Sequence, residues 1–252
     1  MFSLDRKTAI VTGSGSEKGI GRATALALAK QGAVVISADI DAHGADETAK
    51  NIRDLGGKAI GIVLDVTNQN SVDNMIRTTM EEFGRIDILV NNAGISQRVT
   101  VNNMQADDVR RIFEINVIGL FRCTKGVLEI MKRQKYGRIV NMSSAAGKRG
   151  GGFFGGAHYS ASKAAVLGFS KNLAREVAQD GITVNSIAPG LIITDIWDTM
   201  PKEIAEDIIS AIPIGRPGKV NEVAAAIAFL VSDEASYITG EEIDINGGSH
   251  MD

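Results

Sequence analysis

The sequence predicts an α/β protein in which helices cover both faces of a doubly wound parallel sheet, and three observations support this. Short apolar runs rich in β-branched residues alternate with longer stretches of helix-forming residues. The first apolar run ends at a glycine cluster that leads into a helical stretch. No Pro- or Ser-rich linker and no fixed-period repeat divides the chain. We therefore expect residues 1–252 to form a single three-layer α/β/α domain.

The composition narrows the class of protein. The formal net charge is −3 and there is no dense block of Lys and Arg, which argues against a nucleic-acid partner. No apolar run approaches the roughly 18 residues of a membrane span, and the N-terminus lacks the apolar core of a signal peptide. Cys123 is the sole cysteine and the three histidines have no ligand spacing, so we expect no disulfide and no metal site. These features favour a cytoplasmic protein.

The first structural unit carries a candidate phosphate site. Residues 8–12 are apolar β-formers and predict a buried strand, and the stretch 22–30 is rich in helix formers. Between them lies the glycine-rich segment 13–21. In this context glycines let the backbone approach a pyrophosphate, and the helix N-terminus supplies free N–H groups. The pattern predicts a Rossmann-like dinucleotide site, with a glycine-rich loop that binds no ligand as the alternative.

The second unit indicates which dinucleotide binds. The apolar run 33–38 predicts a strand, and Asp39 follows it, 18 residues beyond Gly21. An acidic residue at about this distance accepts hydrogen bonds from the adenosine ribose and repels a 2′-phosphate. Lys18 in the glycine-rich loop favours the opposite preference, because a cation could meet that phosphate. We expect NAD rather than NADP, since a close like-charge contact outweighs a flexible, solvated lysine.

Two further units repeat the alternation. Helical stretches at 42–56 and 69–84 precede strands expected at 58–64 and 85–90. Asp65 and Asn91 come at the ends of these strands, where ligands bind in open parallel sheets. A helix N-cap or a turn is the alternative role for both residues.

Tyr159 and Lys163 form the clearest candidate for acid–base chemistry. They lie four residues apart in the helical stretch 159–179 and therefore one turn apart on the same helix face. A nearby ammonium favours the phenolate and should lower the pKa of Tyr159 toward the working pH. The pattern alone is weak, because such pairs also arise by chance.

The second half of the chain completes the predicted sheet. A long helix from about residue 107 to 133 contains Asn116 as a polar group among apolar neighbours, which needs hydrogen-bond partners. The strand 137–144 ends in two serines, either of which could face a site. A strand at 183–187, a helix at 220–232 and a strand at 242–245 follow.

Taken together, these motifs resemble the short-chain dehydrogenase/reductase family, in its common single-domain type of about 250 residues. The resemblance runs from the first strand to Gly247-Gly248. It rests on the following residues in this order: Thr12-Gly13, Gly19-Ile20-Gly21, Asp65-Val66, Asn91-Asn92-Ala93-Gly94, Asn116, Ser144, Tyr159, Lys163 and Pro189-Gly190-Leu191-Ile192-Ile193-Thr194.

The resemblance implies roles for individual residues. Tyr159 would be the acid–base group and Ser144 the group that binds the substrate oxygen. Lys163 would lower the pKa of Tyr159 and bind the nicotinamide ribose, while Asn116 would hold a water in a proton relay to Lys163. The residues expected to bind the cofactor are Gly13, Ser16, Gly19, Ile20, Gly21, Asp39, Asp65, Val66, Asn92, Ala93, Gly94, Tyr159, Lys163, Pro189, Gly190, Ile192 and Thr194.

Two segments depart from the family pattern. Five residues, in place of three, separate Gly13 from Gly19, so the phosphate contacts of this loop are open. Segment 147–156 is about two residues longer than usual, and it either reshapes the substrate mouth through Phe154 or packs as a surface loop. The family keeps a substrate lid at about 191–215, where Trp197 is the candidate contact and core packing is the alternative.

The expected reaction is hydride transfer between NAD(H) and a secondary alcohol or ketone. Because NAD favours oxidation in cells, a polyol, a sugar or a small hydroxy compound is the first choice of substrate. The alternative is an NADPH-dependent 3-oxoacyl-thioester reductase that acts on acyl-carrier protein, with a basic patch at Lys132, Arg133, Lys135 and Arg175 that is equally typical of a solvated helix face. A further alternative is a non-catalytic nucleotide sensor. The resemblance also implies a homotetramer or homodimer.

Overall fold

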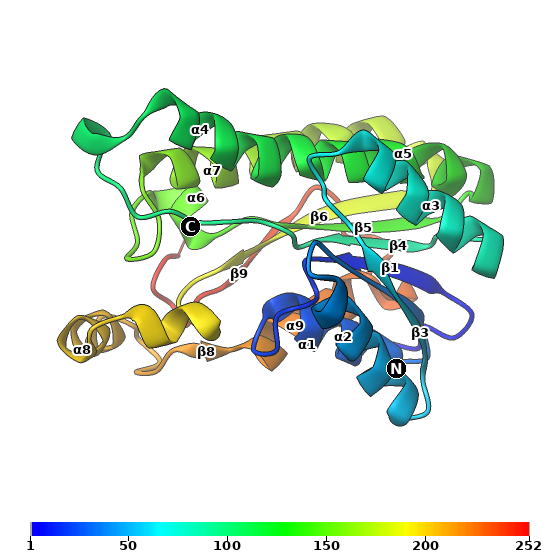
Figure 1. Cartoon of the computed structure of the whole chain (residues 1–252), viewed down its shortest axis with the longest axis horizontal. Helices are drawn as coiled ribbons and strands as arrows, with labels where there is room; N and C mark the ends of the chain where they lie inside the picture. The colour runs from blue at the N-terminus through cyan, green and yellow to red at the C-terminus, as the bar shows by residue number, and fades with distance from the viewer. Residues whose placement is uncertain (1, 252) are drawn as a thin grey trace.

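A seven-stranded parallel sheet forms the centre of the computed structural model, which describes residues 2–251 (Figure 1). Residues 1 and 252 of the expected domain lie outside the described part. The strand order is β3-β2-β1-β4-β5-β6-β9, and every neighbouring pair is parallel. The strands are β1 (Thr8–Thr12), β2 (Val34–Asp39), β3 (Lys58–Val63), β4 (Ile88–Asn91), β5 (Gly137–Met142), β6 (Ile182–Pro189) and β9 (Glu242–Ile245). The order reverses between β1 and β4, which is where ligands bind in such sheets.

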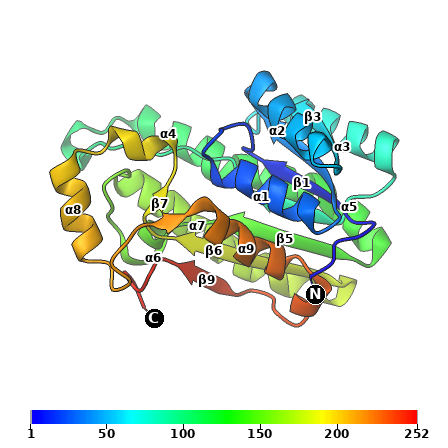
Figure 2. The same cartoon turned by 90° about the horizontal axis from the view of Figure 1, so that it is seen from below.

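Helices cover both faces of this sheet and make three layers (Figures 1 and 2). One layer contains α1 (Ile20–Lys30), α2 (Ala42–Asp54) and α9 (Val220–Leu230), with α1 and α9 side by side in Figure 2. The opposite layer contains α3 (Gln69–Phe83), α4 (Ala106–Phe113), α5 (Leu120–Gln134) and α7 (Ala157–Val177). The predicted Rossmann-like α/β domain is therefore confirmed.

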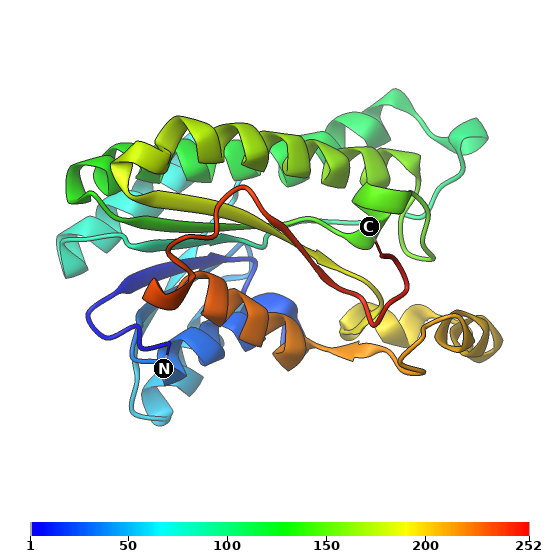
Figure 3. The ribbon, with the colours of Figure 1, turned by 180° about the vertical axis from the view of Figure 1, so that it is seen from behind.

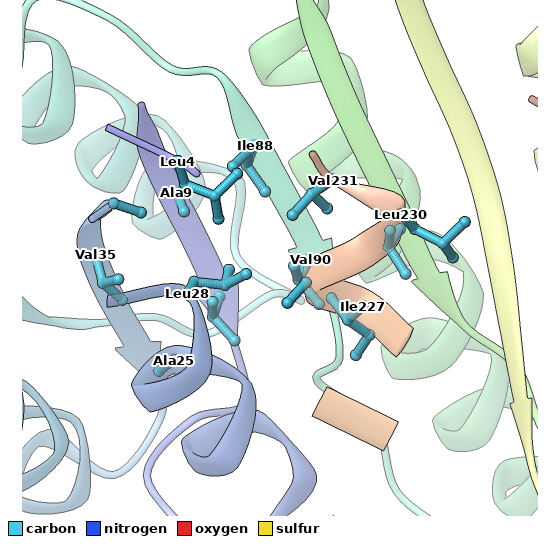
Figure 4. Packing of buried hydrophobic residues seen from close by; sticks show 14 of the residues in the cluster. Leu4, Ala9, Ala25, Leu28, Val35, Ile88, Val90, Ile227, Leu230 and Val231 are labelled. Carbon is cyan, nitrogen blue, oxygen red and sulfur yellow. The ribbon is translucent and has the colours of Figure 1, made fainter. Parts of the chain in front are cut away.

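The core lies in two apolar clusters, one on each face of the sheet. Neighbouring residues of a strand point to opposite faces, so Ala9 and Val11 pack toward α1 and α9 while Ile10 packs toward the layer of α3 and α5. Figure 4 shows the first cluster, in which Leu28 of α1 and Ile227 of α9 meet the strand residues. Strands buried on both faces explain the continuous apolar runs of the sequence.

The long helix expected at 107–133 is interrupted. α4 ends at Phe113, a π-helical stretch spans Glu114–Gly119, and α5 begins at Leu120. Gly119 packs tightly here, because a Cβ on it would lie 2.6 Å from Cγ2 of Val66. The apolar spacing of a single π turn does not differ visibly from that of an α-helix, so the sequence pattern missed the interruption.

Four smaller elements were not predicted. The short helix α6 (Ala145–Arg149) follows β5, and β7 (Ile192–Ile193) pairs with β8 (Gly218–Lys219) as a separate two-stranded sheet. The helix α8 (Lys202–Ser210) stands apart from the two helical layers, at the same end of the molecule as α6 (Figures 1 and 3). Within residues 2–251, no helix is both long and apolar enough to cross a membrane.

Candidate active site

The turn between β1 and α1 leaves room for a ligand beside an uncapped helix end. Gly13 has φ +67°, and a Cβ on it would lie 2.7 Å from Cα of Ala93. Gly21 is tighter still, because its Cβ would meet the carbonyl oxygen of Gly13 at 2.1 Å. The α1 N-cap, Gly19, offers no side chain to the first N–H groups of the helix. Those donors remain open, so this end of α1 fits the pyrophosphate of a dinucleotide.

The side chain of Asn92 fixes the turn to the strand beside it. Its Nδ2 donates to the carbonyl oxygens of Thr12 at 3.0 Å and of Gly13 at 2.8 Å. The hydroxyl oxygen of Thr12 accepts from the backbone N–H groups of Asn92 and Ala93, at 3.1 and 3.0 Å. The ends of β1 and β4 are thereby held together, and residues 92–94 form one wall of the site.

A cavity of about 530 Å³ opens beside this wall, and we call it the Asp39 cavity. The carboxylate of Asp39 accepts from the backbone N–H of Gly15 at 2.7 Å and from that of Asp41 at 3.0 Å. Asp65 also lines the cavity, but its Oδ1 accepts from the N–H and hydroxyl of Thr67 at 2.9 and 2.7 Å. The turn role considered for Asp65 is therefore present alongside its place in the cavity.

A second cavity, of about 280 Å³, is lined by three of the four predicted catalytic residues, Ser144, Tyr159 and Lys163, and is called here the catalytic cavity. Ser144 lies at the end of β5, where its hydroxyl caps α6 by accepting from the N–H of Ala146 at 3.1 Å. Tyr159 and Lys163 face the same cavity from the start of α7. The Lys163 ammonium donates to the carbonyl oxygen of Met142 at 2.8 Å and lies 5.9 Å from the centroid of the Tyr159 ring.

Burial dominates the electrostatics of this pair. Burial lowers the pKa of Lys163 to about 8, because a charged ammonium is poorly solvated there. Burial also raises the pKa of Tyr159, and a hydrogen bond with Ser144 opposes that rise. The expected lowering of the Tyr159 pKa by Lys163 is therefore wrong for this chain. The four-residue spacing on a helix correctly predicted that the Lys163 ammonium lies near the Tyr159 ring. It could not predict that the phenol is buried away from water.

Asn116 is buried in the π-helical stretch and joins the site to α7. Its Oδ1 accepts from the N–H of Ile95 at 2.8 Å, and its Nδ2 donates to the carbonyl oxygen of Ile95 at 2.9 Å. The same Nδ2 donates to the hydroxyl of Ser162 at 3.1 Å, which in turn donates to the carbonyl oxygen of Tyr159 at 2.7 Å. The side chain thus holds both the loop after β4 and the first turn of α7. Its proposed water relay stays a prediction.

The end of β6 completes the catalytic cavity. Four residues predicted to bind the nicotinamide line it, namely Pro189, Gly190, Ile192 and Thr194. Gly190 packs closely, since a Cβ on it would lie 2.8 Å from Cβ of Asn246. A nicotinamide would therefore sit between this segment and the pair of Ser144 and Tyr159.

The predicted cofactor residues divide between the two cavities. The Asp39 cavity is lined by Gly13, Ser16, Asp39, Asp65, Val66, Asn92, Ala93 and Gly94. The catalytic cavity is lined by Ile20, Asn92, Gly94, Tyr159, Lys163, Pro189, Gly190, Ile192 and Thr194. Gly19 and Gly21 line neither cavity and instead shape the turn between them.

The two substrate candidates have different outcomes. Phe154 lines the catalytic cavity, and its ring also packs against that of Phe153, so both roles considered for this segment stay predictions. Trp197 is half-buried near the start of the segment predicted to form a lid, and it is not among the residues that line that cavity. The same segment makes a contact that no local pattern indicates, because the hydroxyl of Ser16 donates to the carboxylate of Asp195.

Sequence reasoning also missed a hydrogen-bonded chain beneath the mouth of the site. His158 is buried, with its Nε2 3.1 Å from Oε1 of Gln97. The side-chain Nε2 of Gln97 donates to Asp108 at 2.7 Å, and the backbone carbonyl oxygen of Gln97 accepts from the backbone N–H of Gly156 at 2.8 Å. The segment after Ser96, which lines the catalytic cavity, is thereby tied to α4 and α7. Among residues 2–251, no group of three or more His, Cys, Asp or Glu side chains could hold a metal ion.

Comparison with known proteins agrees with this arrangement. Residues 13–250 match the family model described as enoyl-(acyl carrier protein) reductase. The chain is 44% identical to the 3-oxoacyl-[acyl-carrier-protein] reductase of Synechocystis sp., covering all of both chains. It is 42% identical to the reductase FabG of the same description from Escherichia coli, over 99% of this chain and all of that one. The crystal structure of gox2181 superposes with a TM-score of 0.94 at 37% identity, over 98% of this chain and 97% of that chain.

These relatives correct the expected substrate. The first choice, a polyol, sugar or small hydroxy compound, is contradicted by full-length relatives that are 3-oxoacyl-[acyl-carrier-protein] reductases, which match the alternative better. That choice rested on the direction of reaction favoured by NAD, and a cofactor preference does not specify a substrate. With its fold, its motif set and its matches over nearly the whole length, the chain belongs to the short-chain dehydrogenase/reductase family of oxidoreductases that use a nicotinamide cofactor.

Proposed function

We propose that this protein reduces 3-oxoacyl thioesters to 3-hydroxyacyl thioesters with NADH. The observation that carries the proposal is the meeting of Ser144, Tyr159 and Lys163 in one cavity beside the Pro189-Gly190 segment. The identity of 41–44% with relatives of the corresponding name supports the choice of substrate.

In the proposed reaction, bound NADH supplies the hydride to the substrate carbonyl carbon. Ser144 donates a hydrogen bond to the carbonyl oxygen and stabilises the charge that develops on it. The Tyr159 hydroxyl gives that oxygen its proton, which completes the alcohol. Because burial raises the pKa of Tyr159, the phenol keeps its proton near neutral pH, as an acid for reduction must. Lys163, fixed by Met142, binds the nicotinamide ribose and stands ready to return a proton to Tyr159.

The preference for NADH rests on Asp39. Its carboxylate is fixed at the mouth of the Asp39 cavity by the N–H groups of Gly15 and Asp41. Ribose hydroxyls can donate to this group, whereas a 2′-phosphate would be repelled by it. The proposal combines the thioester substrate of the alternative with the cofactor predicted from Asp39. A side-by-side titration that gave a lower KM for NADPH than for NADH would contradict this preference.

We also propose that residues 191–215 form a lid over the substrate. The start of this segment is held by pairing of Ile192 with Gly218, while α8 stands apart from the two helical layers (Figure 3). The contact between Ser16 and Asp195 lets this segment respond to the loop that would hold the pyrophosphate.

A homo-oligomer remains part of the proposal. Ile118, at the end of the π-helical stretch, and Phe121, in the first turn of α5, are exposed at 40% and 45%. Neighbouring exposed apolar side chains of this kind favour burial against a second copy. Light scattering of the purified protein should give the mass of a dimer or tetramer. The basic patch considered for an acidic carrier is partly neutralised, because Lys132 and Lys135 pair with Glu129 and Asp180.

The test is a panel assay that follows the concentration of NADH, which falls when a substrate is reduced and rises when one is oxidised. Acetoacetyl thioesters should be reduced, while a crotonyl thioester tests reduction of a carbon–carbon double bond, which the family description includes. Polyols and sugars with NAD test the contradicted substrate class. Turnover of the crotonyl thioester alone would sink the proposal, and the absence of any turnover would favour the nucleotide sensor.

A further inference from the structure

Arg98 lies close to the catalytic cavity in the chain, and its guanidinium packs on an aromatic ring. It comes two residues after Ser96, which lines that cavity, and its side chain is exposed. None of the ion pairs found within residues 2–251 involves Arg98. Arg98 instead stacks on an aromatic face, with Cζ 4.1 Å from the centroid of the Phe153 ring. Stacking holds a guanidinium in place and leaves its N–H edge available to an anion.

The stack continues into the site. The rings of Phe153 and Phe154 meet edge to face, with centroids 5.1 Å apart and planes at 88°, and Phe154 lines the catalytic cavity. Gly155 fixes this end of the segment, because a Cβ on it would lie 2.3 Å from Cδ1 of Tyr159. The stack of Arg98, Phe153 and Phe154 therefore leads directly into Gly155, whose backbone packs against the ring of Tyr159.

A third cavity, of about 450 Å³, adjoins the stack and is called here the Arg98 cavity. Its lining consists of Arg98, Val99, Thr100, Asn103 and the backbone of Gly152, Gly155 and Gly156. The lining offers backbone groups, a hydroxyl, an amide and a guanidinium, alongside the apolar surface of Val99 and of the glycine Cα atoms. Such a surface suits a chain of amides that ends in an anion better than it suits an alkyl chain.

We propose that Arg98 binds the phosphate of the phosphopantetheine arm of the substrate, which runs through the Arg98 cavity while the 3-oxo group lies at Tyr159. The inference rests on the proposed function, because acyl-carrier and coenzyme A thioesters both present their acyl group on this arm. Phosphate matches the fork of N–H donors on a guanidinium. Phe153 is a positioning residue that holds the guanidinium for this contact.

The experiment compares two substrates that differ only in the phosphate, the acetoacetyl thioesters of pantetheine and of 4′-phosphopantetheine. The wild-type protein should have a kcat/KM about tenfold higher for the phosphorylated substrate, mainly through KM. Arg98→Gln should remove this difference and leave the pantetheine thioester unaffected. Arg98→Lys should keep part of it, and Phe153→Leu should lose part of it. Arg110→Gln is the matched control, because Arg110 is exposed on α4 and paired with Asp107.

Parallel assays with acetoacetyl-coenzyme A and an acetoacetyl carrier protein distinguish the two sources of the arm. A lower kcat/KM of Arg98→Gln than of the wild-type protein with either substrate supports the contact. Equal losses for the pantetheine and phosphopantetheine thioesters in Arg98→Gln would overturn the inference, since they would indicate a structural role. The inference would also be overturned if the wild-type protein had the same kcat/KM for the pantetheine and the phosphopantetheine thioesters. Calorimetric binding of 3-hydroxybutyryl phosphopantetheine and pantetheine to the NADH complex repeats the comparison without turnover. If the protein does not reduce 3-oxoacyl thioesters, this difference in binding can still be measured. Failure of the proposed function can therefore be told apart from failure of the proposed phosphate contact.

Discussion

Gly155→Ala should impair catalysis while leaving cofactor binding intact. An added Cβ would lie 2.3 Å from Cδ1 and 2.9 Å from Cγ of Tyr159. Carbon atoms prefer a separation of about 3.5 Å, so the ring or the segment has to move by about 1.2 Å. A displacement of about 1 Å at a reacting group can lower the rate by about 100-fold. The strain should also lower the free energy of unfolding by about 1–3 kcal/mol.

The assay measures kcat for an acetoacetyl thioester, the Kd of NADH by fluorescence titration, and the thermal midpoint. We expect kcat to fall by about 100-fold with an unchanged Kd. Gly168→Ala is the matched control on α7, because a Cβ there would meet nothing within 4 Å. It should leave kcat unchanged and stabilise the helix by about 0.5–1 kcal/mol. The molar mass of both variants is measured as well, to detect an altered oligomer. A Gly155→Ala protein with wild-type kcat would refute the argument that this glycine positions Tyr159.

Three further predictions concern charge. Lys163→Met should raise the free energy of unfolding at neutral pH, because burial lowers the pKa of Lys163 to about 8 and the folded state therefore binds the lysine proton poorly. Denaturant titrations should show the full increase in this free energy below pH 8. The increase should disappear as the pH rises to about 10.5, the pKa of the lysine in the unfolded chain. The kcat for thioester reduction should fall as the pH rises through about 8, because Lys163 there loses the proton that it passes to Tyr159. If the chemical step limits the rate, a kcat that does not change from pH 6 to pH 10 would argue against this role of Lys163. Asp39→Ala should raise the ratio of kcat/KM for NADPH to that for NADH by about tenfold, since a carboxylate no longer meets the 2′-phosphate, and an unchanged ratio would remove Asp39 as the source of the preference.

The sequence predicted the fold and the grouping of the site well, because both depend on local patterns. Apolar runs such as 8–12 gave the strands, and the order of strands and helices implied a parallel sheet whose ends gather Ser144, Tyr159 and Pro189. The contact between Ser16 and Asp195 joins residues 179 positions apart and leaves no local pattern. Its prediction would have required the tertiary structure.

Other differences have physical causes that spacing cannot convey. The pKa of Tyr159 is raised because burial outweighs the hydrogen bond from Ser144, and burial is a property of the folded protein. The π-helical stretch around Asn116 keeps an ordinary apolar pattern. The predicted substrate class was wrong because it was derived from Asp39. This residue would contact the adenosine end of the cofactor, far from the acyl group on which the reaction takes place.

The central claim is that Tyr159 supplies the proton in the reduction of a 3-oxoacyl thioester by NADH. The most direct test is the kcat of Tyr159→Phe with acetoacetyl phosphopantetheine, measured together with the Kd of NADH. Loss of a general acid should lower kcat by about 10²–10⁴-fold, and the Kd should stay unchanged because Lys163 remains fixed by Met142. A variant that keeps most of the wild-type kcat, or a wild-type protein that does not reduce the thioester, would contradict the account.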